Sequence, residues 1–90
     1  MKTILIEIEL LIDKGELEKA EELLSSHKGG ANATFWLLSG KIYQKNQQWG
    51  KAINALQRAL TIDPINKEAK LQIEIIRNIL NFSNPEMFNP

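Results

Sequence analysis

The most informative absence in this 90-residue sequence is that of cysteine. Without cysteine the chain can form no disulfide, no thiolate metal site and no cysteine nucleophile. It also has a single histidine, His27, which alone cannot form a usual zinc or acyl-transfer site. His27 stands near the expected end of a helix, where an imidazole can meet free carbonyl groups. We therefore expect no catalytic role, no metal and no cofactor.

An excess of one charge is also absent, because 11 basic and 11 acidic residues give a formal net charge of zero. Proteins that bind duplex nucleic acid usually have a basic excess, since phosphate contacts supply most of their affinity. The charges are unevenly placed: residues 1–32 have four basic and seven acidic residues, a net charge of −3, and residues 33–66 a net charge of +3. We expect no nucleic-acid partner, and we interpret the acidic residues as a solvated helix face.

Long apolar runs are missing as well. Ile4–Ile6 and Leu10–Ile12 look like the apolar part of a signal peptide, but Glu7 and Glu9 interrupt them and no small-residue cleavage site follows. The same two charges, and the short length, exclude a membrane-spanning helix. We therefore expect a cytoplasmic protein that does not insert into a membrane.

Glycine and proline are scarce, with five and three copies, while leucine, isoleucine, lysine, glutamate, glutamine and alanine dominate. Apolar residues make up 43 % of the chain, which is enough for a core and too much for a disordered protein. A chain of this length predicts one domain. Composition therefore favours a single all-α domain.

The clearest helical pattern lies in residues 33–66. Apolar side chains recur at helical spacing from Phe35 to Tyr43, until the polar run 46–48 interrupts them. The second apolar stripe follows one face of a helix. Its members are Trp49, Ala52, Ile53, Leu56, Ala59 and Leu60. Asp63–Pro64 ends this helix, because proline has no N–H group to continue it.

Residues 1–28 predict another helix pair, with a turn at Lys14–Gly15. Residues 4–10 partly alternate between apolar and charged side chains, and isoleucine favours strands, so a strand is the alternative there. A lone strand would have no partner elsewhere in the chain. A helix is therefore the better interpretation.

Residues 67–82 predict a fifth helix with Asn66 as its N-cap, and residues 83–90 a short tail. This helix has a second apolar stripe that one neighbouring helix cannot cover. Its members are Leu71, Ile75, Ile79 and Phe82. We expect the tail to fold back over this stripe through Met87 and Phe88, together with weak homodimerisation.

The two helix pairs are similar to each other. Overlaying residues 4–24 on residues 36–56 matches Leu24 with Leu56, and internal similarity at a fixed period indicates a repeat array. Residues 33–66 resemble a tetratricopeptide repeat. The residues that carry the resemblance are Trp36, Gly40, Tyr43, Ala52, Ala59 and Pro64. The departures are Ser39, Leu56 and Gln47, the last in a turn that often has glycine. The ending, residues 79–90, also looks like the tail of very small stand-alone repeat proteins of bacteria.

The resemblance implies a short right-handed solenoid of two antiparallel helix pairs with a capping helix. Residues 1–28 would be a degenerate repeat, residues 33–66 a well-matched repeat and residues 67–82 the cap. Gly40 and Ala52 would then let the helices of the second pair approach closely.

In this family the first helix of each pair lines a concave groove that takes a peptide or helix of a partner protein. The matching positions here, which we expect to be exposed, are Leu5, Glu9, Ile12, Asp13, Thr34, Leu37, Leu38, Lys41, Gln44, Lys45, Leu71, Gln72, Ile75, Asn78 and Ile79. Some members grip a C-terminal carboxylate with lysine, asparagine and arginine. That clamp is absent, because the matching positions hold Leu5, Glu9, Leu38, Glu68 and Gln72.

The resemblance therefore implies a protein–protein interaction module without enzymatic activity. The alternative is a dedicated chaperone for a small secreted or membrane-associated helix, which would differ by being unstable or aggregated without its client.

Overall fold

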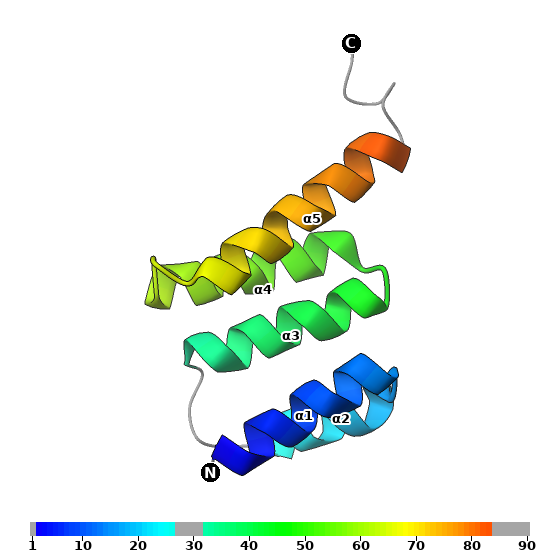
Figure 1. Ribbon diagram of the computed structural model, residues 1–90, viewed down its shortest axis with the longest axis vertical. Coiled ribbons are helices and arrows are strands. Elements are labelled where there is room, and N and C mark those ends of the chain that lie inside the picture. The colour runs from blue at the N-terminus through cyan, green and yellow to red at the C-terminus, as the bar shows by residue number, and fades with distance from the viewer. Residues whose placement is uncertain (1, 27–31, 84–90) are drawn as a thin grey trace.

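The computed structural model describes residues 2–26 and 32–83, which fold into five α-helices (Figure 1). They are α1 (Lys2–Lys14), α2 (Leu17–Ser26), α3 (Ala33–Lys45), α4 (Trp49–Ile62) and α5 (Lys67–Ser83). The prediction of an all-α chain is confirmed, and α5 ends one residue beyond the predicted bound. The expectations for His27 and for the tail from residue 84 onward fall outside the described residues.

The helices are stacked along the long axis of the molecule as a short helical solenoid. α1 and α2 lie at one end, α3 in the middle, and α4 with α5 at the other end (Figure 1). α3 packs against each of the other four helices, α1 packs on α2, and α4 packs on α5. Within the described residues α1 and α5 have no direct backbone contact. The central helix therefore connects the two ends.

The first segment is helical along its whole described length, so the alternative of a strand is excluded. Ile8 and Ile12, four residues apart, are fully buried against the rest of the protein. Ile6 and Leu10, also four residues apart, point to solvent with exposed fractions of 58 % and 53 %. Apolar side chains on two sides of one helix therefore produced the strand-like alternation of the sequence.

The two turns inside the helix pairs have the same hydrogen-bond pattern. In the first, the Gly15 N–H donates to the Ile12 carbonyl at 3.0 Å and the Glu16 N–H to the Leu11 carbonyl at 2.9 Å. In the second, at the equivalent positions of the next pair, the Gln47 N–H donates to Gln44 at 3.0 Å and the Gln48 N–H to Tyr43 at 2.9 Å. This is the pattern of a Schellman C-cap, whose central residue adopts a left-handed conformation. Gly15 has φ 83° and Gln47 has φ 60°.

Asparagine caps the N-termini of α3 and α5. The side-chain oxygen of Asn32 accepts a hydrogen bond from the Phe35 N–H at 2.8 Å. The side-chain oxygen of Asn66 accepts one from the Ala69 N–H at 3.0 Å, which confirms the predicted cap. Each cap satisfies one helix N–H that has no partner within the helix. Such a cap stabilises the folded protein by about 1 kcal/mol.

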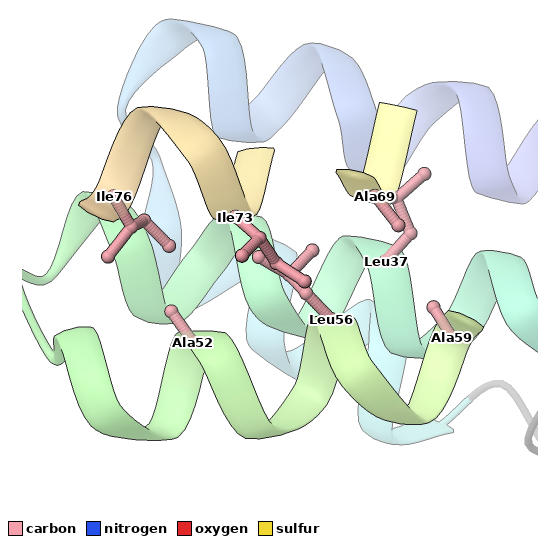
Figure 2. Close-up of a cluster of buried hydrophobic side chains, with 7 residues drawn as sticks. All are labelled: Leu37, Ala52, Leu56, Ala59, Ala69, Ile73 and Ile76. Carbon is pink, nitrogen blue, oxygen red and sulfur yellow. The ribbon is translucent and has the colours of Figure 1, made fainter. Parts of the chain in front are cut away.

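The core consists of two clusters that meet at α3. The first joins α3, α4 and α5 (Figure 2) through Leu37, Ala52, Leu56, Ala59, Ala69, Ile73 and Ile76. The second joins α1, α2 and α3 through Ile8, Ile12, Ala20, Leu24, Leu38 and Ile42. Adjacent leucines of α3, Leu37 and Leu38, thus belong to different clusters. α3 is sandwiched between its neighbours rather than covered on one face.

α3 and α4 approach each other closely at Gly40 of α3. A Cβ atom built on Gly40 would lie 2.7 Å from Cγ of Leu56 and 3.3 Å from the carbonyl oxygen of Ala52. Leu56 and Ala52 are both fully buried, so neither has free space to move into. The expectation that Gly40 and Ala52 allow the two helices to approach closely is confirmed, because α3 has room for a hydrogen atom only.

Gly40→Ala is expected to lower the free energy of unfolding by about 1–3 kcal/mol, because a methyl group must force Leu56 out of a packed site. Urea unfolding followed by circular dichroism measures the change. The matched control is Gly50→Ala in α4, where an added Cβ meets no atom within 4 Å. That variant should gain up to about 1 kcal/mol from helix propensity. Equal effects of the two substitutions would contradict the close contact.

Gln47→Gly is expected to stabilise the protein by about 0.5 kcal/mol. A left-handed backbone costs a residue with a side chain about 1–2 kcal/mol, and the greater freedom of glycine in the unfolded chain offsets part of that gain. Thermal unfolding measures the shift. Gln48→Gly serves as the control, because Gln48 has φ −92° and glycine removes no strain there. An unchanged or lower melting temperature for Gln47→Gly would contradict the assignment of strain.

Candidate functional site

One face of the molecule is formed jointly by α1, α3 and α5. A hollow of about 380 Å³ lies between these helices. Its lining residues are Leu5, Ile6 and Glu9 of α1, Thr34, Leu37 and Leu38 of α3, and Glu68 of α5. We call this hollow the groove. It brings together side chains from both ends of the solenoid over the central helix.

Lys41 of α3 links the two carboxylates of the groove. Its Nζ atom lies 2.9 Å from Oε2 of Glu9 and 2.5 Å from Oε2 of Glu68. The Lys41 side chain is only 14 % exposed, whereas those of Glu9 and Glu68 are 45 % and 43 % exposed. The Lys41 side chain is therefore more deeply buried than those of its two partners. Burying a charge without partners costs free energy. The two carboxylates offset this cost and so allow a lysine at this position.

Burial and ion pairing change the pKa of Lys41 in opposite directions. Burial alone would lower the pKa of the Lys41 ammonium. The hydrogen bonds and negative charges of Glu68 and Glu9 act in the opposite direction and outweigh it, so the pKa is raised above its ordinary value of 10.5. Lys41 therefore remains charged in the folded protein at neutral pH, and the ion pairs persist there.

Most of the side chains predicted for the concave face are accessible to some degree. Those that are exposed or half-buried are Leu5, Glu9, Asp13, Thr34, Lys41, Gln44, Lys45, Leu71, Gln72, Ile75, Asn78 and Ile79. Among them, Leu5, Glu9 and Thr34 line the groove, and Lys41 bonds to its carboxylates. Leu71 follows Glu68 by three residues on the same side of α5 and is 52 % exposed, so it stands beside the groove without lining the hollow itself.

For three predicted members of the concave face, the expectation that they are exposed is wrong. Ile12 is 1 % exposed, Leu37 8 % and Leu38 2 %. Ile12 and Leu38 pack in the cluster of α1, α2 and α3, and Leu37 packs in the other cluster. Leu37 and Leu38 still contribute their surfaces to the floor of the groove. Replacing either by a charged residue would damage the core, so neither is suitable for a binding test.

Two groove residues were not predicted. Glu68 stood out only as a departure from the carboxylate clamp, and Ile6 only as part of the short apolar run Ile4–Ile6. One signal could have pointed to the Glu9–Lys41 ion pair, because these two residues fall at the same position when the two helix pairs are aligned. Residues at equivalent positions of adjacent repeats face each other across the stack.

The aromatic residues of α3 serve packing. The Phe35 and Trp36 rings meet edge to face, with centroids 5.2 Å apart. The Arg58 guanidinium of α4 lies 4.8 Å from the centroid of the Trp36 ring, which places a cation over it. Trp36, Tyr43 and Trp49 also pack against the buried cluster of α3, α4 and α5. Trp36 and Trp49 are therefore packing residues.

The described part of the chain offers no group of three or more histidine, cysteine, aspartate or glutamate side chains that could hold a metal ion. The acidic side chains of α2, Glu18, Glu21 and Glu22, are exposed. Among residues 2–26 and 32–83, none of the helices has both the length and the apolar character needed to cross a bilayer.

Comparison with protein families finds a match over residues 33–66 to the family described as tetratricopeptide repeat. The protein contains a tetratricopeptide repeat. The match covers α3, α4 and the turn before α5, the part of the chain that includes the Gly40 contact. Tetratricopeptide repeats generally mediate protein–protein interaction and are not catalytic. No curated protein and no solved structure matches the chain.

Two departures from the tetratricopeptide pattern can be placed in the structure. Leu56, where the pattern has phenylalanine, fills the space directly over Gly40 and is fully buried. Gln47, where glycine is common, adopts the left-handed conformation that glycine favours. The tetratricopeptide repeat therefore keeps its helix contact and its turn geometry in spite of these substitutions.

The stability that Lys41 contributes is expected to disappear at alkaline pH. Because its pKa is higher in the folded than in the unfolded chain, the contribution is complete below about 10.5 and is lost as pH rises through the folded value. The difference in free energy of unfolding between the wild type and Lys41→Met, measured in urea from pH 8 to 12, should shrink above about pH 10.5. Lys45→Met, which alters an exposed lysine on the same helix, is the control. A constant difference across this range would contradict the ion pairs.

Proposed function

We propose that the protein binds a segment of a partner protein in the groove between α1, α3 and α5. The observation that supports this most directly is the hollow itself, with a floor of Leu37 and Leu38 and an exposed wall at Ile6. Concave, largely apolar sites with a few placed polar groups are the usual form of a binding site. The tetratricopeptide repeat at residues 33–66 adds the family tendency to bind proteins.

The groove depends on α1 as much as on the matched repeat, so α1 and α2 have to be part of the binding unit. We propose that this first pair is a divergent second repeat. Its turn makes the same hydrogen bonds as the α3–α4 turn, at the equivalent positions of the aligned pairs. Ala20 and Leu24, which align with Ala52 and Leu56, are buried as their counterparts are.

A dedicated chaperone, the alternative function, would be unstable without its client. The described residues leave no buried side-chain polar atom without a hydrogen bond, and two clusters of buried apolar side chains hold the helices. A well-satisfied core favours a protein that is folded before it binds, as an interaction module is.

The test uses a library of random 12-residue peptides displayed on phage and selected on the folded protein. Peptides recovered on the wild type are expected to lose binding at least about tenfold to the double variant Ile6→Glu, Leu71→Glu, because each change places a charge where an apolar contact forms. Both side chains are more than half exposed, so the melting temperature should stay nearly unchanged.

The matched control is the double variant Ile62→Glu, Ile65→Glu. These side chains are 50 % and 80 % exposed, and neither lines the groove nor lies one helical turn from a residue that does. The control adds the same two charges to exposed aliphatic side chains, so it should retain the peptides. Recovered peptides that bind both variants equally, or a selection that yields none, would overturn the proposed function.

A further inference from the structure

The surface that a partner meets at the groove is negative. Glu9, Glu68 and Lys41 together have a net charge of −1, because two carboxylates flank one ammonium group. The side chains of Glu9 and Glu68 are about three times as exposed as that of Lys41. A partner therefore meets the two glutamate side chains before the more deeply buried lysine.

Each carboxylate also keeps an oxygen available. Both ion pairs use the Oε2 atoms of Glu9 and Glu68. Within the described residues, no hydrogen bond or ion pair is made by either Oε1 atom. An ionised carboxylate can accept several hydrogen bonds, so both side chains can take a second cationic donor without releasing Lys41.

The apolar part of the groove lies beside these oxygens. Glu9, Leu5 and Ile6 come from adjacent turns of α1, and Glu68 lines the same hollow from α5. A segment that fills the hollow with an aliphatic side chain would place its neighbouring residues against the carboxylates. An acidic neighbour would meet like charges and would have to displace a carboxylate to reach Lys41.

We propose that the occupant of the groove is a protein segment with an aliphatic side chain next to a lysine or arginine. The aliphatic group packs against Leu5 and Ile6, and the cation lies between the free oxygens of Glu9 and Glu68. This inference rests on the proposed function, whose groove it occupies. It predicts a contact of the opposite charge from the C-terminal carboxylate that the clamp of some family members holds.

The peptides selected for the proposed function provide the first test. Among those that lose binding to Ile6→Glu, Leu71→Glu, lysine or arginine should be enriched within four residues of leucine, isoleucine or methionine. Groove-dependent peptides that lack this enrichment, or that are enriched in aspartate and glutamate, would overturn the inference and leave the proposed function intact. Peptides with no dependence on the groove would overturn both.

The second test changes the peptide and leaves the protein as it is. One selected peptide is synthesised with its lysine or arginine and again with methionine at that position. The methionine form is expected to bind roughly fivefold more weakly at low ionic strength, and the difference should narrow as salt is added. Equal affinities of the two peptides at low salt would contradict a cation at the carboxylates.

The third test locates the contact on the protein. In the double variant Glu9→Gln, Glu68→Gln, the cationic and the methionine form of the peptide should bind almost equally. The two carboxylate charges that favour the cationic form have been removed. The control Glu7→Gln, Glu74→Gln removes two exposed charges from the same helices outside the groove and should preserve the difference. If the double groove variant unfolds, the single variants Glu9→Gln and Glu68→Gln each leave Lys41 one carboxylate. Either should reduce the difference between the peptides, and an unchanged difference in both would overturn the inference.

Discussion

The contact between Gly40 and Leu56 sets how closely α3 and α4 pack, and α3 in turn contacts each of the other helices. It brings α3 and α4 so close that only a hydrogen atom fits between them at this point. Lys41 follows Gly40 and therefore points about 100° further around the helix, away from α4 and toward the face shared with α1 and α5. The adjacent residues Gly40 and Lys41 thus serve two purposes. Gly40 allows the contact with α4, and Lys41 forms the charged centre of the groove.

The fold of residues 33–66 was predictable because its signals are local. Pro64 ends a helix by its own chemistry, and the stripe from Trp49 to Leu60 can be read from one helix alone. Asn66 was identified as a cap for the same reason, since capping needs only a side chain and a nearby N–H group. The first helix was harder, because Ile6 and Leu10 add an exposed apolar side that periodicity cannot separate from a strand.

The sequence predicted most of the side chains on the concave face, but not which of them the neighbouring helices bury. The helical period tells which side chains share a face, and it does not tell how far the neighbouring helices reach around that face. Leu37 and Leu38 are adjacent on α3, and each is covered by a different cluster because α3 has neighbours on both sides. Glu68 was missed because its contact with Lys41 depends on the angle at which α5 crosses α3, which only the folded chain defines.

The double ion pair of Lys41 also has a mechanical consequence. α1 and α5 have no backbone contact with each other in the described residues, yet each supplies one of the two carboxylates that hold the same lysine. Any flattening of the solenoid that moves the first and last helices apart must lengthen at least one of these pairs. A single side chain of the middle helix therefore resists changes in the curvature of the whole array.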